Sequence, residues 1–189
     1  MGVYYINAAR SLLRSEPTEV FAATANNGEE RFRNIEEMTS VVMRFPGERL
    51  AAFTCSFGAA DVSRYSLIGT KGLLTADPAY EYAMAIKQRM ILGGKTKIRT
   101  FRKRDQFAAE ISYFSDCILN DKEPEPSGLE GLADVRIVQA IYESAQTGKT
   151  VRVPELPAKE RPTMDQEIRQ PAHEKPKTVH TKSPSGEAA

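Results

Sequence analysis

The chain has 189 residues, of which 41% are hydrophobic and 27% charged, and its formal net charge at pH 7 is +1. This composition is typical of a folded, water-soluble protein, and the balanced charge argues against a dedicated nucleic-acid binder. No apolar run reaches the roughly 18 residues of a membrane span, and no secretory signal opens the chain. We therefore expect a cytoplasmic protein, with a signal lost from in front of residue 1 as an open alternative.

A helix over residues 2–13 is the first element that the sequence predicts. Ile6, Ala9 and Leu13 form an apolar stripe at helical spacing, and Pro17 ends the helix because proline lacks an N–H group. No Ser, Thr, Asp or Asn precedes the helix to satisfy its free N–H groups. We interpret this as a chain that begins within a domain, and we expect the first turn to fray.

Strands follow this helix, each marked by alternating apolar and polar residues. The predicted strands are residues 18–25, 37–45, 50–57, 64–69, 73–76, 83–92 and 95–101. Turn residues such as Pro46–Gly47 and Gly93–Gly94 separate neighbouring strands, which predicts three antiparallel hairpins. The apolar face of the strand at 37–45 is formed by Thr39, Val41, Met43 and Phe45.

Two further helices and a short strand at 151–153 complete the predicted elements. Asp105 is placed to cap the first of these helices, and Ser127 with Glu130 forms a capping box at the start of the second. Gly148 ends the second helix as a left-handed C-cap. The first helix carries an apolar stripe that we assign to the core: Phe107, Ile111, Phe114 and Ile118.

This order of elements predicts an α+β fold over residues 1–153. We expect one large antiparallel-dominated sheet with helices packed on one face and the other face open. Small residues such as Ala52 and Thr54 on the open face favour a homo-oligomer formed through the sheet, and an ordinary solvated face is the alternative. Residues 154–189 are rich in proline and contain no aromatic residue, which predicts a disordered tail.

Histidine is confined to the predicted tail, at His173 and His180. Proton transfer in the folded part must therefore use Tyr, Asp, Glu, Lys or Cys. Cys55 and Cys117 fit no metal-binding spacing, so we expect two buried free thiols and no metal site. No Gly-x-Gly-x-x-Gly sequence occurs, and we therefore expect no Rossmann domain in this chain.

Several stretches together resemble the C-terminal domain of the glucose–fructose oxidoreductase / inositol dehydrogenase / MocA family. Residues 2–10 and 16–20 resemble the helix and strand that open this domain. Residues 68–72 resemble its central hairpin, residues 105–110 its penultimate helix, and residues 124–145 with 147–149 its closing helix and strand. The resemblance covers residues 2–153 in order and is nearest to the glucose–fructose oxidoreductase branch.

The resemblance implies part of a two-domain oxidoreductase that acts on the CH–OH group of a sugar or cyclitol. A Rossmann domain binds NAD(P) in this family, and the C-terminal domain closes the substrate pocket and forms the oligomer. We therefore expect the substrate-binding and oligomerisation part of such an enzyme, inactive alone, with a separate Rossmann chain as one source of the missing half. The alternative is a stand-alone, non-catalytic domain that binds a sugar or a partner through its sheet face.

The family pattern Asp-x-Gly-x-His/Tyr-x-x-Asp/Asn aligns with Gly2, Tyr4 and Asn7, and its first aspartate falls before residue 1. The resemblance implies that Tyr4 is the acid–base residue, assisted by a lysine of a Glu-Lys-Pro motif in the other domain. An amphipathic tyrosine at a domain edge is the alternative for Tyr4. Asn7 is expected to bind a substrate hydroxyl, and Arg10 either faces the substrate or lies exposed on the helix. The tail tripeptide Glu174–Pro176 repeats the lysine motif without a strand to orient it, and we assign it no role.

Overall fold

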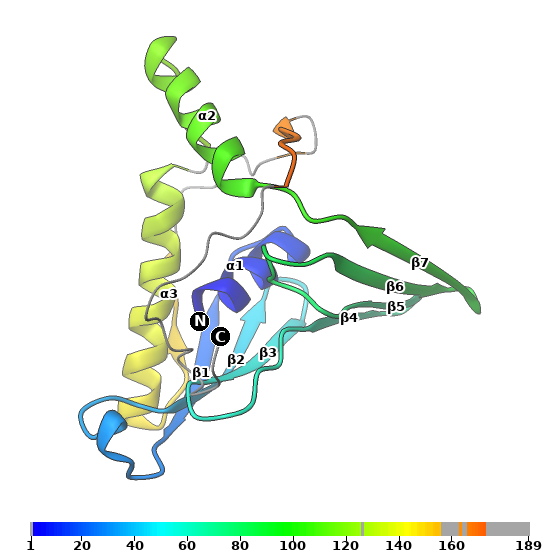
Figure 1. The fold of residues 1–189 in the computed structure, drawn as a ribbon. Coiled ribbons are helices and arrows are strands. Elements are labelled where there is room, and N and C mark those ends of the chain that lie inside the picture. The colour runs from blue at the N-terminus through cyan, green and yellow to red at the C-terminus, as the bar shows by residue number, and fades with distance from the viewer. Residues whose placement is uncertain (1, 126, 156–162, 164–165, 173–189) are drawn as a thin grey trace. The chain divides into compact units, whose positions relative to one another are not determined.

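The computed structural model describes residues 2–125, 127–155, 163 and 166–172 (Figure 1). The chain divides into two compact units, which are described separately below. Unit 1 consists of Met1–Ala59 with Pro124–Thr163, and unit 2 consists of Ala60–Glu123 with Met164–Ala189. The rest of the predicted tail, including both histidines and the tripeptide at 174–176, lies outside the described residues.

Unit 1 combines two long helices with a four-stranded antiparallel sheet in the order β3-β2-β1-β8. Its elements are α1 (Gly2–Leu13), β1 (Glu19–Ala25), a 3-10 turn (Glu30–Phe32), β2 (Met38–Phe45), β3 (Arg49–Ser56), α3 (Gly128–Thr147) and β8 (Val151–Arg152). The predicted bounds of β1, β2 and β3 are confirmed to within one residue. The register places Val41 of β2 beside Ala22 of β1 and Phe53 of β3.

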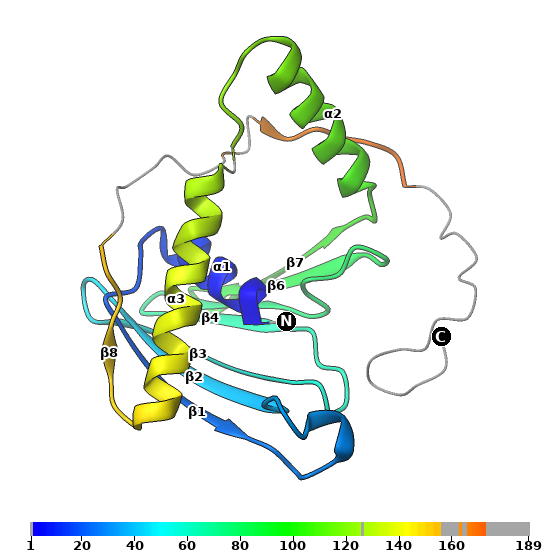
Figure 2. The same ribbon diagram turned by 90° about the vertical axis from the view of Figure 1, so that its left-hand side faces the viewer.

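The core of unit 1 lies between this sheet and α1 with α3, which cover the same face of the sheet (Figure 2). Val41, Met43 and Phe45 alternate along β2 and are buried, as the period of a strand requires. Ile6 of α1 and Ile137 of α3 pack against them. The predicted stripe of α1 is therefore confirmed, with Ile6 buried and its neighbours Ala9 and Leu13 partly buried against the core.

The two ends of α3 match the prediction unequally. Gly148 is the expected left-handed C-cap, with φ 65° and an N–H that donates to the Ser144 carbonyl at 2.8 Å. Ser127 is the N-cap, but its side chain makes no capping hydrogen bond. The predicted capping box is therefore wrong, because the Glu130 carboxylate pairs instead with Arg10 at 3.0 Å.

Unit 2 contains a second four-stranded antiparallel sheet, in the order β4-β5-β6-β7, and one helix. Its elements are β4 (Tyr65–Gly69), β5 (Gly72–Ala76), β6 (Ile86–Leu92), β7 (Lys95–Phe101) and α2 (Gln106–Leu119). The Asp105 carboxylate accepts a hydrogen bond from the Ala108 N–H at 2.8 Å, which confirms the predicted cap of α2.

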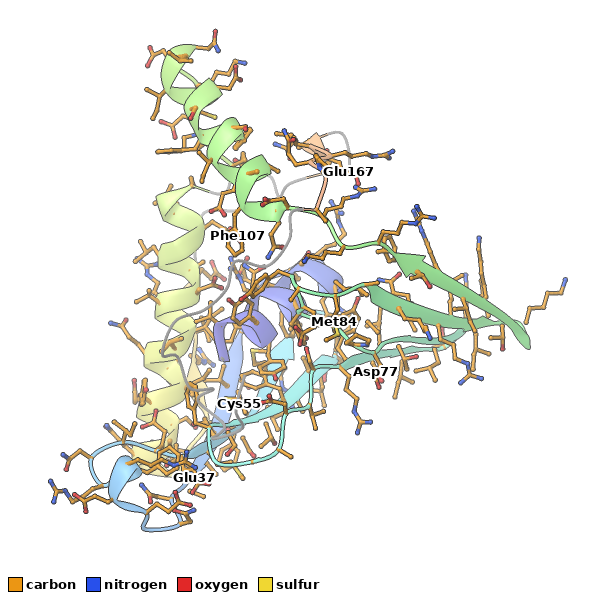
Figure 3. The ribbon with its side chains drawn as sticks, viewed as in Figure 1. Glu37, Cys55, Asp77, Met84, Phe107 and Glu167 are labelled. Atoms are coloured by element: carbon orange, nitrogen blue, oxygen red, sulfur yellow. The ribbon has the colours of Figure 1, made fainter. Side chains whose placement is uncertain are left out.

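The apolar stripe of α2 was expected in the core, and this expectation is wrong. Phe107 and Ile111 are 53% and 67% exposed, and Phe114 and Ile118 are exposed as well. Figure 3 shows Phe107 near the start of α2, where its ring meets the edge of Tyr82 at a centroid distance of 5.5 Å. Helical periodicity identifies an apolar face, but it does not show that any surface of the same chain covers that face.

The α+β class and all three predicted hairpins are confirmed. The described strands are hydrogen-bonded as two four-stranded sheets, whereas the sequence predicted one. The difference arises at residues 57–64, between β3 and β4, where the described residues form no strand. Alternation and turn residues specify which neighbours pair as a hairpin, but not whether consecutive hairpins join into one ladder.

Candidate functional site

The predicted site residues Tyr4 and Asn7 lie on the exposed face of α1. Their spacing of three residues places them beside one another, and Ser11 continues the same row one turn later. Tyr4 is 63% exposed, whereas Ile6 on the other face is buried in the core. Because α1 is held by its apolar face, the Tyr4 hydroxyl and the Asn7 amide are both presented outward from unit 1.

Among the described residues, Arg10 is the one charged residue that is fully buried, with 1% of its side chain exposed. Its Nε lies 2.6 Å from Glu16, and its Nη1 lies 2.6 Å from Asp134 and 3.0 Å from Glu130. Burial alone would lower the pKa of Arg10, but the hydrogen bond and charge of Glu16, with the charges of Asp134 and Glu130, raise it above the ordinary value. The expectation of an exposed Arg10 is therefore wrong, because α3 supplies two carboxylates that enclose it.

Asp134 joins this ion-pair network to the exposed row of α1. One of its carboxylate oxygens binds Arg10, and the other accepts a hydrogen bond from Nδ2 of Asn7 at 3.4 Å. A carboxylate can only accept hydrogen bonds, so Asn7 must turn its NH₂ group toward Asp134. The carbonyl oxygen of Asn7 makes no side-chain hydrogen bond within the described residues and can accept one from a donor such as a hydroxyl group.

The partners of Arg10 could not be assigned from the sequence. Glu130 and Asp134 are spaced i, i+4, which places both carboxylates on one face of α3, and this local signal was available. The cation that they meet lies 124 residues before Asp134 in the chain. Long-range packing of α1 against α3 brings them together.

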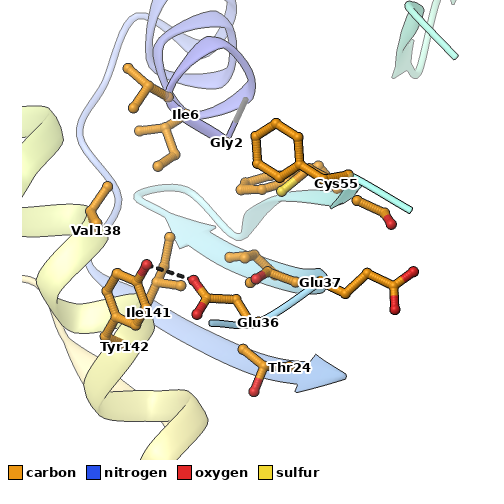
Figure 4. A pocket seen from close by; sticks show the side chains of 15 residues that line it. Gly2, Ile6, Thr24, Glu36, Glu37, Cys55, Val138, Ile141 and Tyr142 are labelled. Atoms are coloured by element: carbon orange, nitrogen blue, oxygen red, sulfur yellow. Dashed lines mark hydrogen bonds between the residues drawn. The ribbon is translucent and has the colours of Figure 1, made fainter. Parts of the chain in front are cut away.

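A cavity of about 220 Å³ lies between the first turn of α1, the three long strands and α3 (Figure 4). Gly2 forms part of its wall, and a Cβ atom at Gly2 would lie 3.7 Å from the Cys55 sulfur. The Tyr142 hydroxyl donates a hydrogen bond of 2.6 Å to the Glu36 carboxylate, drawn as a dashed line in Figure 4. The carboxylate of neighbouring Glu37 extends away from Tyr142 in the same view. No short-range sequence pattern indicates this cavity, because Glu36 and Tyr142 are 106 residues apart.

The phenol and thiol groups in and beside the cavity have pKa values raised above their usual ranges. The hydrogen bond to Glu36, together with partial burial and the Glu36 charge, raises the pKa of Tyr142 above its usual range. Burial raises the pKa of the Cys55 thiol, and burial also raises the pKa of Tyr5, whose ring stacks on Phe53 at 5.3 Å. Cys55 and Cys117 are free thiols as expected, although Cys55 is only half-buried.

Over residues 2–125, 127–155, 163 and 166–172, no group of three His, Cys, Asp or Glu side chains is arranged to hold a metal ion. In that part of the chain, no helix has both the length and the apolar character needed to cross a bilayer.

Known proteins are similar to this chain in sequence and in fold. The family model described as "Oxidoreductase family, C-terminal alpha/beta domain" matches residues 1–153. The chain is 32% identical over 157 residues to D-xylose 1-dehydrogenase (NADP(+)) of Haloarcula marismortui, in an alignment that covers 81% of this chain and 42% of that protein. It is 27% identical over 155 residues to D-xylose 1-dehydrogenase (NADP(+)) 2 of Haloferax volcanii, covering 81% of this chain and 46% of the relative.

A solved structure gives the same result. The crystal structure of aldose-aldose oxidoreductase from Caulobacter crescentus complexed with glycerol superposes with a TM-score of 0.73 at 34% identity. The superposition covers 80% of this chain and 45% of that protein. The chain therefore spans less than half the length of each of these three relatives.

Proposed function

Since this chain belongs to the glucose–fructose oxidoreductase / inositol dehydrogenase / MocA family of oxidoreductases, we propose that it forms the substrate-binding and oligomerisation part of an NAD(P)-dependent sugar or cyclitol oxidoreductase. The observation that carries this proposal is the family match over residues 1–153, supported by 34% identity to an aldose-aldose oxidoreductase. The substrate class follows from the relatives, whose names specify D-xylose and aldoses.

The substrate surface that we propose is the exposed row of α1. Tyr4 presents a phenol that exchanges a proton with a sugar hydroxyl, which suits the oxidation or reduction of a carbinol. Asn7 accepts a hydrogen bond from a neighbouring hydroxyl through its carbonyl oxygen, because Asp134 holds its NH₂ group. Arg10 is enclosed by three carboxylates, so we assign it to the support of this surface rather than to contact with the sugar.

The residues of this chain do not fit the nucleotide itself. Dinucleotides bind where a glycine-rich turn leads from a strand into a helix, and the sequence contains no Gly-x-Gly-x-x-Gly. The elements of the described part also pair only in antiparallel ladders, without a βαβ unit. We therefore propose that NAD(P) is held by polypeptide other than these 189 residues, either covalently continuous with them or a separate Rossmann chain.

The outer face of the unit 1 sheet supports the oligomerisation role. Phe21 on β1 and Val42 on β2 are 44% and 43% exposed on the face opposite α1 and α3. A shallow hollow on this face is lined mainly by small or apolar side chains, including Ala52 and Thr54. An apolar face of this kind on a sheet is a frequent site of association between identical subunits.

Ligand binding by the 189-residue chain tests the proposal. In saturation-transfer NMR, we expect D-xylose to receive magnetisation from the protein, and we expect Asn7→Ala to weaken binding about fivefold through loss of one hydrogen bond. Gln146→Ala, which removes an exposed side-chain amide from α3 and leaves the α1 row intact, is the matched control and should leave the signal unchanged. NADPH fluorescence should not change on addition of the chain.

Two results would overturn parts of this proposal. An absence of sugar contact, or equal effects of the Asn7 and Gln146 variants, would remove the α1 row as the substrate surface. A change in NADPH fluorescence that saturates with the chain would show that these residues hold the nucleotide after all.

A further inference from the structure

The strongest concentration of charge in the chain is basic and lies on the β6–β7 hairpin of unit 2 and the short segment that follows it. Residues 86–104 contain eight Lys or Arg residues and no Asp or Glu, although the net charge of the whole chain is only +1. Residues 154–189 contain six basic and six acidic residues, so the tail does not supply an acidic run to oppose the hairpin. The hairpin therefore carries positive charge that its own sequence does not balance.

Three of these basic residues form a row along β7. The register places Lys95, Lys97 and Arg99 on one face of the strand, because successive strand residues point to opposite faces. Their cross-strand neighbours on β6 are two apolar residues and a glutamine. All three basic side chains are exposed, and among the described residues none of them has a carboxylate partner. The row thus presents a cation about every 7 Å, which is twice the rise of one strand residue.

The backbone of β7 is unpaired along one side. Among the described strands, β7 pairs with β6 alone and is the last strand of its sheet (Figure 1). The two glycines of the Gly93–Gly94 turn both have positive φ, and a two-residue turn of this type makes a hydrogen-bonded pair of the residues that flank it. Bonded and non-bonded residues alternate from there, so the backbone N–H and C=O groups of Thr96, Ile98 and Thr100 face the free edge.

The basic row and the free edge share the repeat of an extended peptide. A peptide strand that pairs with β7 through its main chain places every second side chain on the basic face, again about 7 Å apart. Carboxylates at these positions lie opposite basic side chains, and such cross-strand pairs stabilise a sheet. The intervening residues lie beside Ile98, which is 61% exposed, and this position suits β-branched side chains. A second copy of β7 does not fit, because it would place like charges opposite one another.

We propose that β7 of unit 2 is a docking edge for an extended segment of another protein in which acidic and β-branched residues alternate. Main-chain hydrogen bonds at Thr96, Ile98 and Thr100 hold the segment, and the basic row selects its sequence. A nucleic acid fits less well, because its phosphates accept hydrogen bonds but cannot donate to the free C=O groups of the edge. The site lies wholly within unit 2 and does not depend on the proposed oxidoreductase function.

The capped heptapeptide Thr-Glu-Val-Glu-Val-Glu-Thr is the probe, and Thr-Glu-Glu-Val-Val-Glu-Thr is its control, with the same composition but with glutamates on both faces. Each peptide is titrated into the ¹⁵N-labelled 189-residue chain. The alternating peptide should shift the amide signals of Thr96, Ile98 and Thr100 and slow their hydrogen exchange, because these N–H groups become bonded. The control peptide should bind at least about fivefold more weakly, because fewer of its carboxylates oppose a basic side chain.

Lys97→Glu should weaken binding of the alternating peptide about fivefold, because it replaces an attraction with a repulsion. Lys71→Glu makes the same charge change in the exposed turn between β4 and β5, two strands from β7, and should change binding by less than about twofold. No binding, equal binding of the two peptides, equal loss in the two variants, or shifts without slowed exchange at the free edge would each overturn the proposal. Tighter binding of a ten-nucleotide oligothymidylate than of the alternating peptide would do the same. If Lys97→Glu does not fold, the comparison of the two peptides on the unsubstituted chain decides.

Discussion

Arg10 provides the sharpest test of how α1 is held on unit 1. Arg10→Met keeps a long apolar stem but removes the guanidinium, which leaves Glu16, Glu130 and Asp134 without their shared cation. Loss of one partner from a buried ion pair costs about 3–5 kcal/mol. The carboxylate side chains are 35%, 19% and 14% exposed, respectively, so that water partly compensates them. We therefore expect the lower end of that range, about 3 kcal/mol.

Urea unfolding followed by circular dichroism measures this loss. With an m value of about 2 kcal/mol per molar urea, the midpoint of the transition should fall by about 1.5 M. Arg44→Met is the matched control, because Arg44 is half-exposed and pairs with the exposed carboxylate of Glu48. It should change the free energy of unfolding by no more than about 0.5 kcal/mol. Equal shifts for the two arginine variants would refute the argument that burial makes the Arg10 network stabilising.

Three further measurements address other features of unit 1. Because the pKa of Tyr142 is raised in the folded state, its contribution to stability should be complete below about pH 10 and should decline as the pH rises above that value. The difference in stability between the unsubstituted chain and Tyr142→Phe should therefore shrink above about pH 10. A difference that grows with pH would contradict the assignment to the hydrogen bond with Glu36. Gly148→Ala should destabilise the chain by about 1–2 kcal/mol, because the φ angle of 65° at this position is unfavourable for alanine. Gly131→Ala within α3 should stabilise the chain by about 0.5–1 kcal/mol in the same urea assay, because alanine favours a helix more than glycine does. Changes of the same sign in the two variants would refute the C-cap argument. Val42→Lys, on the outer face of the sheet, should shift the chain toward monomer in sedimentation velocity, and an unchanged oligomeric state would remove that face as the interface.

The elements of the fold were predictable wherever a short-range pattern determines them. Val41, Met43 and Phe45 could be assigned to one face of β2 because successive strand residues point to opposite faces. Gly148 could be assigned as a C-cap because a left-handed residue at a helix end favours glycine. In each case the information lies within a few residues of the feature itself.

The candidate sites depended on contacts that no short-range pattern contains. Tyr4 and Asn7 could be placed on one face of α1, but the direction of the Asn7 amide is set by Asp134, 127 residues later. Arg10 was misjudged for the same reason, because an arginine two turns into an amphipathic helix is ordinarily exposed. The stripe of α2 shows the reverse error. Its helical spacing correctly identified an apolar face, but the sequence contained no evidence that another part of the chain covers this face, and the stripe is exposed.

The Arg10 network explains how a helix packed by an apolar stripe can present its other face accurately. A stripe of Ile6, Ala9 and Leu13 packs by non-directional contacts, which tolerate small rotations of α1 about its axis. A guanidinium held at 2.6 Å by carboxylates of two different segments tolerates such rotation poorly, because its hydrogen bonds are directional. Asp134 then extends the same constraint to Asn7. The direction in which the exposed row faces is therefore determined by buried charge, and the burial of Arg10 is consistent with a requirement for orientation as well as for stability.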